Sequence, residues 1–332
     1  MIHPVIILLG SSDEAHTKAL LEYLPKAQWL LLDEGWLHRE NVLEWRLDRN
    51  EPVILKLGDN QVDLGCLRSV FYRPREYQVE GGRLEPVLLR PHFSVTPHDT
   101  LFAQFEAQST LLGALDCFNC LWVNHPLSDR FADYKLHQLA VARNLGLRVP
   151  DTLISSDREA LRAFWHQHQG KVITKAITVY PSALLESEVF FTHMVTDTDL
   201  DLLEASAPGP ILFQEFIPAR LDLRVTIIGD EVFSTAIYSQ EGKSPLDWRR
   251  DYTVRFTPHT LDEHIASALK KVASAFRLAY GAVDLRLTPE GEPVFLEINA
   301  QGSYIFVEEL TGQPLTRSLA DLLQRGKLNR AM

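Results

Sequence analysis

The chain has 332 residues, of which 45% are hydrophobic and 23% are charged, and its formal net charge is −11 at pH 7. This composition is that of an ordinary globular protein, and the length predicts two or three packed domains. The acidic balance argues against a nucleic-acid-binding protein and against a protein adsorbed to a membrane surface, because both usually carry an excess of basic residues.

Three cysteines are too few for a disulfide framework. Cys117 and Cys120 form a C-x-x-C pair with no second pair, and we interpret them as incidental thiols rather than a metal or redox site. The N-terminus lacks the basic segment of a signal peptide, and no apolar run reaches the ~20 residues needed to span a bilayer. These features predict a cytoplasmic protein in a reducing compartment.

The first 122 residues alternate between strand-like and helix-like segments. Short apolar runs predict strands at residues 4–9, 29–32, 53–57 and 67–73. Ser11 and Glu14 have the spacing of a capping box that opens a helix through Leu24, and a second helix is expected at residues 97–115. This order predicts an N-terminal α/β domain over residues 1–122 with a parallel sheet.

Residues 123–212 are expected to form a central domain. A helix at 131–145 is closed by Gly146, and a strand starts near 149–152. Ser156 and Glu159 form a second capping-box pattern, for a helix that reaches about residue 169. Residues 171–176 are strand-like, and 190–195 are their expected partner.

Residues 213–332 are expected to form a C-terminal domain of antiparallel strands. Strands are predicted at 211–216, 223–229, 231–239, 282–288 and 294–300. Gly229-Asp230 predicts a hairpin turn, and Thr260 with Glu263 predicts the start of an amphipathic helix that runs to Gly281. Helices mixed with antiparallel strands favour an α+β / α/β fold over one continuous doubly wound sheet.

The last hairpin carries the most informative polar residues. Alternation places Asp284 on one face of its first strand, and Glu297 and Asn299 on one face of its second. Folding the hairpin about Glu290-Gly291 sets Asp284 opposite Glu297, with Cβ atoms ~5 Å apart, where two like charges are destabilising. Two carboxylates and a carboxamide are hard oxygen ligands of the kind that Mg²⁺ takes. The alternative is a solvated polar face in a slightly different register.

The spacing Asp284-x(12)-Glu297-x-Asn299 resembles the metal-binding signature of ATP-grasp ligases. The resemblance implies an ATP-grasp fold, in which an N-terminal pre-ATP-grasp domain precedes central and C-terminal ATP-grasp subdomains. It also implies that Asp284, Glu297 and Asn299 hold Mg²⁺ over the phosphates of ATP. Magnesium ions in such a place neutralise and position the phosphoryl group that is transferred.

Further residues match this family in the expected order. Lys135 is similar to the lysine on the helix that enters the ATP-grasp region, and Lys175 to the lysine that reaches the phosphates. The segment Gln214-Glu215-Phe216-Ile217 resembles the strand whose backbone reads the adenine edge. Asp222 stands where the family often has a ribose-binding acid, with a surface ion pair to Arg224 as the alternative. Residues 176–187 contain no glycine, so no phosphate loop is assigned.

A closer resemblance, over nearly the whole chain, is to the microviridin-type or graspetide synthetases, which cyclise ribosomally made peptides. It is carried by Tyr72-Arg73-Pro74, Asp222-Leu223-Arg224, Asp247-Trp248-Arg249 and residues 297–304. Ala300 and Ser303-Tyr304 depart from the usual form of the last motif, so no subgroup is assigned.

This resemblance implies that ATP phosphorylates an Asp or Glu side chain of a precursor peptide. A Ser or Thr hydroxyl or a Lys amine then attacks the acyl phosphate. Arg224 becomes the candidate for holding the acidic substrate group, with Arg249 and Arg73 as further catalytic candidates. A peptide of leader plus acidic core is the implied partner, and a homodimer is common in that family. An amino-acid ligase of the glutamate-ligase type and a nucleotide-binding regulator without catalysis stay open as alternatives.

Overall fold

The computed structural model describes residues 2–32, 41–44, 54–73, 97–177, 191–205 and 209–329. The chain divides into two compact units, one made of Met1–Asn124 with Thr316–Asn329 and the other of His125–Leu315. The predicted division at residues 122/123 and 212/213 stays a prediction. In the predicted elements, Val53, Pro74 and Phe190 lie outside the described residues, as do residues 178–187 of the glycine-free segment.

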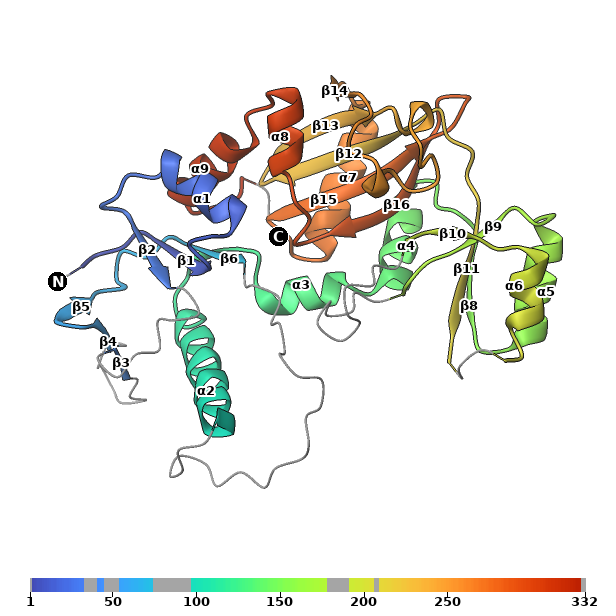
Figure 1. The fold of residues 1–332 in the computed structure, drawn as a ribbon. Helices are drawn as coiled ribbons and strands as arrows, with labels where there is room; N and C mark the ends of the chain where they lie inside the picture. Colours follow the sequence, from blue (N-terminus) through green and yellow to red (C-terminus); the bar gives the residue numbers. More distant parts are fainter. Residues whose placement is uncertain are drawn as a thin grey trace. The chain divides into compact units, whose positions relative to one another are not determined.

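The first unit is built on a parallel four-stranded sheet in the order β2-β1-β6-β7 (Figure 1). These strands are β1 (Ile6–Gly10), β2 (Trp29–Leu32), β6 (Ser69–Arg73) and β7 (Leu121–Val123). β1 is buried at every position, as expected for an apolar strand inside a parallel sheet that helices cover. The parallel sheet predicted for this part of the chain is therefore confirmed.

The helices that belong to this sheet or border it are α1 (Ala15–Tyr23), α2 (Pro97–Leu115) and α9 (Leu315–Arg325). The Ser69 hydroxyl donates a hydrogen bond to the Leu323 carbonyl at 2.7 Å, which fixes the end of the chain to β6. A separate small antiparallel sheet contains β3 (Val42–Glu44), β4 (Ile54–Leu57) and β5 (Asn60–Val62). The strand predicted at 53–57 corresponds to β4, so its expected place in the parallel sheet was wrong.

The second unit contains two antiparallel sheets. The smaller has the order β10-β9-β11-β8, with β8 (Thr152–Ser155), β9 (Val172–Thr174), β10 (His193–Met194) and β11 (Ile211–Glu215). α5 (Arg158–Gln167) and α6 (Asp197–Leu202) lie side by side next to it (Figure 1). Leu161, Phe164, Leu200 and Phe213 form the core between these helices and the sheet.

The larger sheet has the order β14-β13-β12-β15-β16. Its strands are β12 (Leu221–Ile228), β13 (Glu231–Ile237), β14 (Phe256–His259), β15 (Tyr280–Leu287) and β16 (Pro293–Asn299). Alternate residues of β12 and β15, such as Leu223 and Val283, pack in one core with α4 (Lys135–Asn144) and α7 (Glu263–Ala275). The residues in between, among them Arg224 and Asp284, therefore face the opposite side of the sheet.

Several predicted helix boundaries were wrong. The single helix at 131–145 is two helices, α3 (Pro126–Ala132) and α4, because Asp133 ends the first and Tyr134 precedes the second. The helix predicted to reach Gly281 ends at Ala275, where Arg277 has a φ of 56° and the chain turns into β15.

None of the three predicted capping boxes forms as expected. The helix N-caps are Glu14, Asp157 and Asp262, each lying after the Ser or Thr that the pattern favoured. Glu14 and Asp157 cap with their own carboxylates, which accept from backbone N–H groups of the first turn. A carboxylate at this position also interacts favourably with the helix dipole, so it competes well with a hydroxyl.

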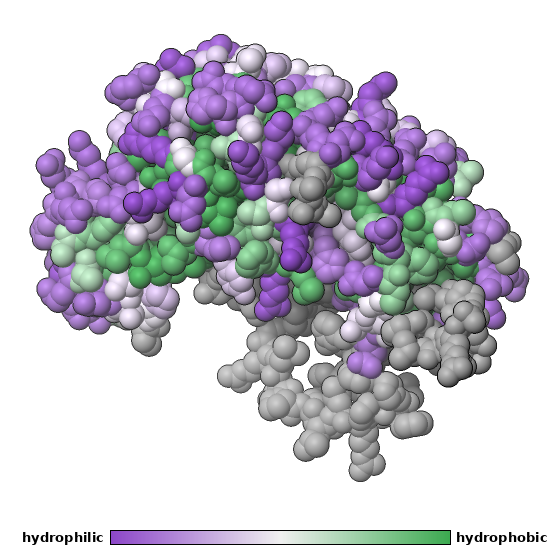
Figure 2. Space-filling view, turned by 180° about the vertical axis from the view of Figure 1, so that it is seen from behind, coloured by the Kyte–Doolittle hydropathy of each residue, from purple (hydrophilic) through white to green (hydrophobic). Residues whose placement is uncertain are grey.

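Within the described residues, no helix is both long and apolar enough to cross a membrane. Seen from behind, hydrophilic side chains cover much of the coloured surface, and hydrophobic ones come to the surface between them (Figure 2).

Candidate active site

One face of the larger sheet carries a row of charged side chains across three strands. Strand pairing sets Arg224 on β12 opposite Asp284 on β15, and Asp284 opposite Glu297 on β16. The predicted facing of Asp284 and Glu297 is therefore confirmed. A bulge after Asp284 shifts the register by one residue toward the turn, so the predicted register fails for Leu285 and beyond.

Arg224 is the buried cation of this row, with 6% of its surface exposed. Its guanidinium donates to both oxygens of Asp284, at 3.0 and 3.1 Å, and to the carbonyl of Ser303 at 3.1 Å. Its Nε–H is buried and has no hydrogen-bond partner among the residues that the structure describes. A buried donor without an acceptor is costly, so this N–H is available to an anionic ligand.

Gly302 lets the chain pass close over this arginine. A Cβ at that position would lie 2.6 Å from a terminal nitrogen of Arg224 and 2.6 Å from the Cβ of Ala282. The glycine is therefore required by the close approach of the loop after β16 to Arg224.

Glu297 forms ion pairs with Lys135 and Lys175, the two lysines predicted to bind ATP. Lys135 Nζ lies 3.0 Å from its carboxylate and Lys175 Nζ lies 3.8 Å from it. Burial alone would raise the pKa of Glu297, but Lys175 and Lys135 outweigh burial and lower it to about 2. Burial raises the pKa of Asp284; Arg224 opposes that rise and Glu297 adds to it.

The side chain of Gln138 fixes Lys135 relative to Glu297. Its amide nitrogen donates to the Ile298 carbonyl at 2.9 Å, and its amide oxygen accepts from the Ile298 N–H at 2.9 Å. The side chain therefore pairs with the edge strand β16 as a neighbouring strand would. Sequence reasoning missed Gln138, because a glutamine three residues after a lysine has no distinctive pattern.

Arg249 belongs to the short 3-10 helix Trp248–Arg250 that follows Asp247. It is held by Asp247, whose oxygens accept from its Nε at 2.8 Å and from a terminal nitrogen at 2.6 Å. The pKa of Arg249 is raised by Asp247 first, and the more distant Glu297 and Asp284 contribute to the rise. The structure thus brings Arg249 into the field of the predicted metal ligands.

The predicted metal ligands are two carboxylates and the Asn299 side chain, which is exposed and accepts from the Gln301 N–H at 2.8 Å. No cluster of three or more His, Cys, Asp and Glu residues suited to a metal occurs in the described part of the chain. The set still fits Mg²⁺, because that ion uses few protein carboxylates and keeps waters and phosphate oxygens as its other ligands. The surrounding lysines and arginines fit the phosphates that would accompany it.

The predicted adenine-binding segment lies at the end of β11. Gln214 is buried and donates to the Thr152 hydroxyl at 2.8 Å, and Ile217 is buried with its carbonyl accepting from Arg286 at 3.3 Å. The Phe216 N–H donates to the Lys171 carbonyl at 2.9 Å. The Glu215 carboxylate accepts from the Asp151 N–H at 3.1 Å.

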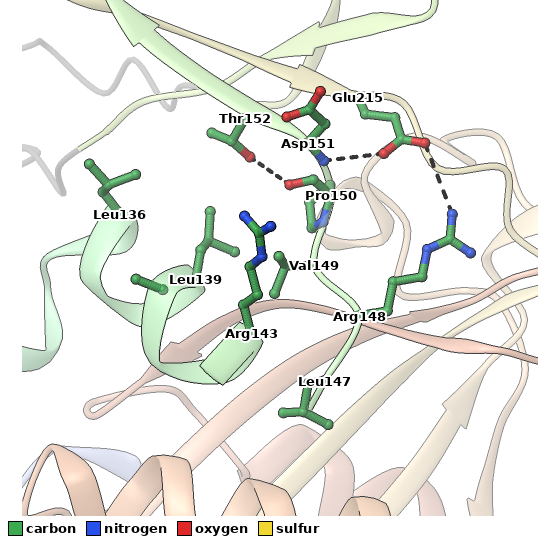
Figure 3. A pocket seen from close by; sticks show the side chains of 11 residues that line it. Leu136, Leu139, Arg143, Leu147, Arg148, Val149, Pro150, Asp151, Thr152 and Glu215 are labelled. Carbon is green, nitrogen blue, oxygen red and sulfur yellow. Dashed lines mark hydrogen bonds and ion pairs between the residues drawn. The ribbon is translucent and has the colours of Figure 1, made fainter. Parts of the chain in front are cut away.

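Glu215 lines a cavity of about 560 Å³ between α4, the segment leading into β8 and the end of β11 (Figure 3). Leucines of α4 and Val149 and Pro150 form its apolar wall, and Arg148 points toward Glu215 at 4.0 Å (Figure 3). Of the residues assigned to ATP or metal, Glu215 alone lines this cavity. The residues of the charged row do not line this cavity.

Asp222 has a partner that the sequence did not predict. Its two oxygens accept from Arg286 at 2.9 and 3.3 Å, and both residues are buried. The alternative for Asp222, a surface pair with Arg224, was wrong, because Arg224 pairs with Asp284 instead.

Arg73 lies in the other unit, at the carboxyl end of β6. Its Nε donates to Glu14 at 3.1 Å, and Glu14 also pairs with the buried ring of His16. This cluster sits where parallel strands β1 and β6 end, the edge at which α/β sheets place ligands. The role of Arg73 in catalysis stays a prediction.

Comparison with known proteins agrees with this architecture. The macrocyclase MdnC of Microcystis aeruginosa MRC, solved with its precursor peptide MdnA, is 26% identical, with a TM-score of 0.74; the match covers 96% of this chain and 99% of MdnC. A RiPP-associated ATP-grasp ligase of Chryseobacterium gregarium, solved with ADP and a leader and core peptide, is 24% identical, with a TM-score of 0.78 and complete coverage of both chains.

The ATP-grasp ligase PsnB, solved with a variant of its minimal precursor, Mg and ADP, is 20% identical, with a TM-score of 0.72; the match covers 98% of this chain and 99% of PsnB. No protein-family model and no curated protein matches the sequence. The chain has the ATP-grasp fold. It matches ATP-grasp ligases and macrocyclases of ribosomal peptides over essentially its full length, which confirms the predicted fold class and the predicted resemblance.

Proposed function

We propose that this chain is an ATP-dependent ligase that closes macrocycles in a ribosomally made precursor peptide. It activates Asp or Glu side chains and joins them to Ser or Thr hydroxyls as esters, or to Lys amines as amides. The observation that carries the proposal is the row Arg224–Asp284–Glu297, flanked by Lys135 and Lys175. The full-length similarity to MdnC, a macrocyclase solved with a precursor peptide, supports the same conclusion.

Lys135 and Lys175 are proposed to bind the phosphates of ATP, and Asp284, Glu297 and Asn299 to hold Mg²⁺. The metal supplies neutralisation of phosphate charge at the transferred group. Glu297 engages both lysines here, so a polyphosphate would compete with this carboxylate for the two cations. The solved complexes of PsnB and the Chryseobacterium ligase contain ADP, which supports nucleotide binding on this fold.

Gln214, Glu215, Phe216 and Ile217 are proposed to form the adenine edge of the site, chiefly through their backbone. Asp222 is not proposed to bind the ribose of ATP, because Arg286 donates hydrogen bonds to both of its carboxylate oxygens. A ribose hydroxyl would have to compete with a buried, charge-assisted pair.

Arg224 is proposed to hold the acidic group of the substrate through its unpartnered Nε–H, with Arg249 beside it. The γ-phosphoryl group passes from ATP to the substrate carboxylate, and ADP leaves. The hydroxyl or amine of the peptide then attacks the acyl carbon, phosphate leaves, and the nucleophile loses its proton. The arginines hold the substrate carboxylate in line and stabilise its charge, which is most of what a protein contributes to phosphoryl transfer.

The test is mass spectrometry of a short acidic precursor peptide encoded beside the gene, after incubation with the protein, ATP and Mg²⁺. We expect the peptide to lose the mass of one water for each ring closed. A gain equal to an amino-acid residue would instead establish the amino-acid ligase alternative. An unchanged peptide with nucleotide bound would contradict the macrocyclase assignment.

A further inference from the structure

Asp247 is a buried carboxylate that joins two parts of the second unit. It precedes the short 3-10 helix η3 (Trp248–Arg250), and 6% of its surface is exposed. One oxygen accepts from the Arg249 side chain and backbone N–H, and the other accepts from the Arg249 side chain and from the Thr192 N–H at 3.2 Å. Four N–H donors converge on this one side chain, which is unusual for a residue outside the row of metal ligands.

Thr192 directly precedes β10 of the smaller sheet, and Lys175 directly follows β9, the strand that pairs with β10. His193 on β10 is paired with Thr174 on β9. Because these two residues are the last of β9 and the first of β10, the chain ends that carry Lys175 and Thr192 leave the sheet at the same point. Asp247 therefore fastens the loop that carries Arg249 to the strand end that carries Lys175.

A second contact strengthens the same junction. The guanidinium of Arg250 lies over the ring of Phe191, 5.0 Å from its centre. Cation–π contacts of this kind add a modest attraction that does not depend on Asp247. The junction therefore survives substitution of Asp247, while the orientation of Arg249 does not.

The pairing with Asp247 fixes which edge of Arg249 is free. A guanidinium has five N–H donors in one plane, and the bidentate contact uses two of them, on Nε and one terminal nitrogen. The remaining donors point away from Asp247. Glu297 and Asp284 also contribute to raising the pKa of Arg249, so its guanidinium lies within the electrostatic influence of the charged row.

We propose that Asp247 is a positioning residue for the ligase reaction, which orients the free edge of Arg249 toward the acidic group of the substrate and keeps it in register with Lys175. The inference rests on the proposed function. Its substrate class is a peptide carboxylate and the acyl phosphate derived from it, since both present oxygens that a guanidinium edge matches.

The experiment is a double-mutant cycle on the full chain with Asp247→Asn, Arg249→Ala and the double variant, measuring peptide cyclisation at saturating ATP. Asp247→Asn should lower kcat/KM for the peptide by about 10- to 100-fold, the range expected for losing charge-assisted hydrogen bonds. The KM for ATP should stay within about twofold. The kcat/KM of the double variant for the peptide should be no lower than that of Arg249→Ala, because Asp247 acts through that arginine.

Asp251→Asn is the matched control, since Asp251 lies in the same loop and organises it through Thr253 and Lys243 without contacting Arg249. It should keep the wild-type rate. Additive losses in the double variant, or an equal loss in Asp251→Asn, would overturn the positioning role. If Asp247→Asn does not fold, Asp247→Glu is measured in its place, because it keeps the charge but moves it. The expected changes in kcat/KM and in the KM for ATP are the same.

An inactive wild-type protein would overturn the proposed function and this inference together. The inference alone fails when the wild type closes rings and Asp247→Asn does so at the same rate.

Discussion

Asp284 and Glu297 face each other across β15 and β16, and each carboxylate is met by a cation from another element of the fold. Asp284 is held by Arg224 at 3.0 Å, and Glu297 by Lys135 at 3.0 Å. The repulsion between the buried Asp284 carboxylate and the half-buried Glu297 carboxylate is thereby offset by these cations. The arrangement suits a site that must stay folded before metal and nucleotide enter it.

The first prediction concerns the metal ligands. The double substitution Glu297→Gln with Asn299→Ala should abolish ATP turnover, because it removes one carboxylate and the carboxamide from the proposed Mg²⁺ site. Thermal unfolding should show a folded protein, since neither side chain lies in the apolar core. Turnover is measured as ADP release at saturating Mg²⁺.

Glu292→Gln is the control for this variant, because Glu292 lies on the same hairpin but pairs with Arg148 at the surface. It should keep the wild-type rate. Full activity of the double variant with Mg²⁺ bound would refute the metal assignment.

The second prediction concerns the glycine over Arg224. Gly302→Ala places a methyl group 2.6 Å from the Arg224 guanidinium and 2.6 Å from the Ala282 Cβ, so the loop after β16 must shift and the arginine must move away from Asp284 and Ser303. We expect peptide turnover to fall by about tenfold or more, with nucleotide affinity changed much less, because misplacing a reacting group costs rate before it costs binding. The measurement is kcat for the peptide beside the Kd for ATP.

Gly113→Ala tests whether any added methyl group has this effect. Gly113 lies inside α2, and a Cβ added there would meet no atom within 4 Å from the described residues outside its own helix turn. This substitution should leave turnover unchanged and stabilise the protein by roughly 0.5–1 kcal/mol. An equal loss of turnover in both variants would contradict the role of Gly302.

The charged row was predictable because its geometry is local. Alternation and the turn at Glu290-Gly291 suffice to place Asp284 opposite Glu297, and a bulge displaces the pairing only nearer the turn. Arg224 was expected on the substrate side, but its pairing with Asp284 depends on which strand lies beside β15. Strand order is a tertiary property that periodicity does not encode.

Short strands, and contacts between residues far apart in the sequence, were not predictable for the same reason. β5 and β14 have three and four residues, and neither contains the short apolar run by which the equally short β2 was predicted. Gln138 and Ile298 are 160 residues apart, and Asp247 and Thr192 are 55 apart. No local sequence pattern near these four residues indicates which residue each one contacts.

The third prediction concerns pH and the Glu14 cluster. Burial raises the pKa of Glu14, but hydrogen bonding to His16, the charge of Arg73 and the Thr17 N–H outweigh it and lower the pKa from 4.5 to about 2. A depressed carboxyl pKa stabilises the fold above the unfolded-state value, and that stability is lost as the pH falls through the folded-state value. The sensitive window therefore lies between about pH 4.5 and about pH 2.

Glu14→Gln should lower the free energy of unfolding by on the order of 2 kcal/mol at pH 7, through the lost pair and the weakened helix cap. The difference from wild type should shrink as the pH falls below 4.5 and close near pH 2. Urea unfolding at a series of pH values measures it. If the difference in unfolding free energy between Glu14→Gln and the wild type were constant across this pH range, the charge of the Glu14 carboxylate would contribute nothing to stability.

The last prediction separates two roles for Asp222. Its pair with Arg286 is buried, and removing one partner leaves an uncompensated charge, so Asp222→Asn should cost about 3–5 kcal/mol of unfolding free energy. Nucleotide affinity of the variant that remains folded should change little, because Arg286 already occupies both oxygens. Urea unfolding and ATP binding at low temperature measure the two effects.

Glu241→Gln is the matched control, since Glu241 pairs with Arg255 at 3.0 Å at the surface, where both side chains are more than half exposed. Surface pairs contribute about 0–1 kcal/mol, so this variant should unfold nearly as the wild type does. A large loss of ATP affinity in Asp222→Asn with unchanged stability would return Asp222 to the nucleotide site. In that case a ribose hydroxyl would compete successfully with Arg286 for the Asp222 carboxylate, and the buried ion pair would be secondary to nucleotide binding.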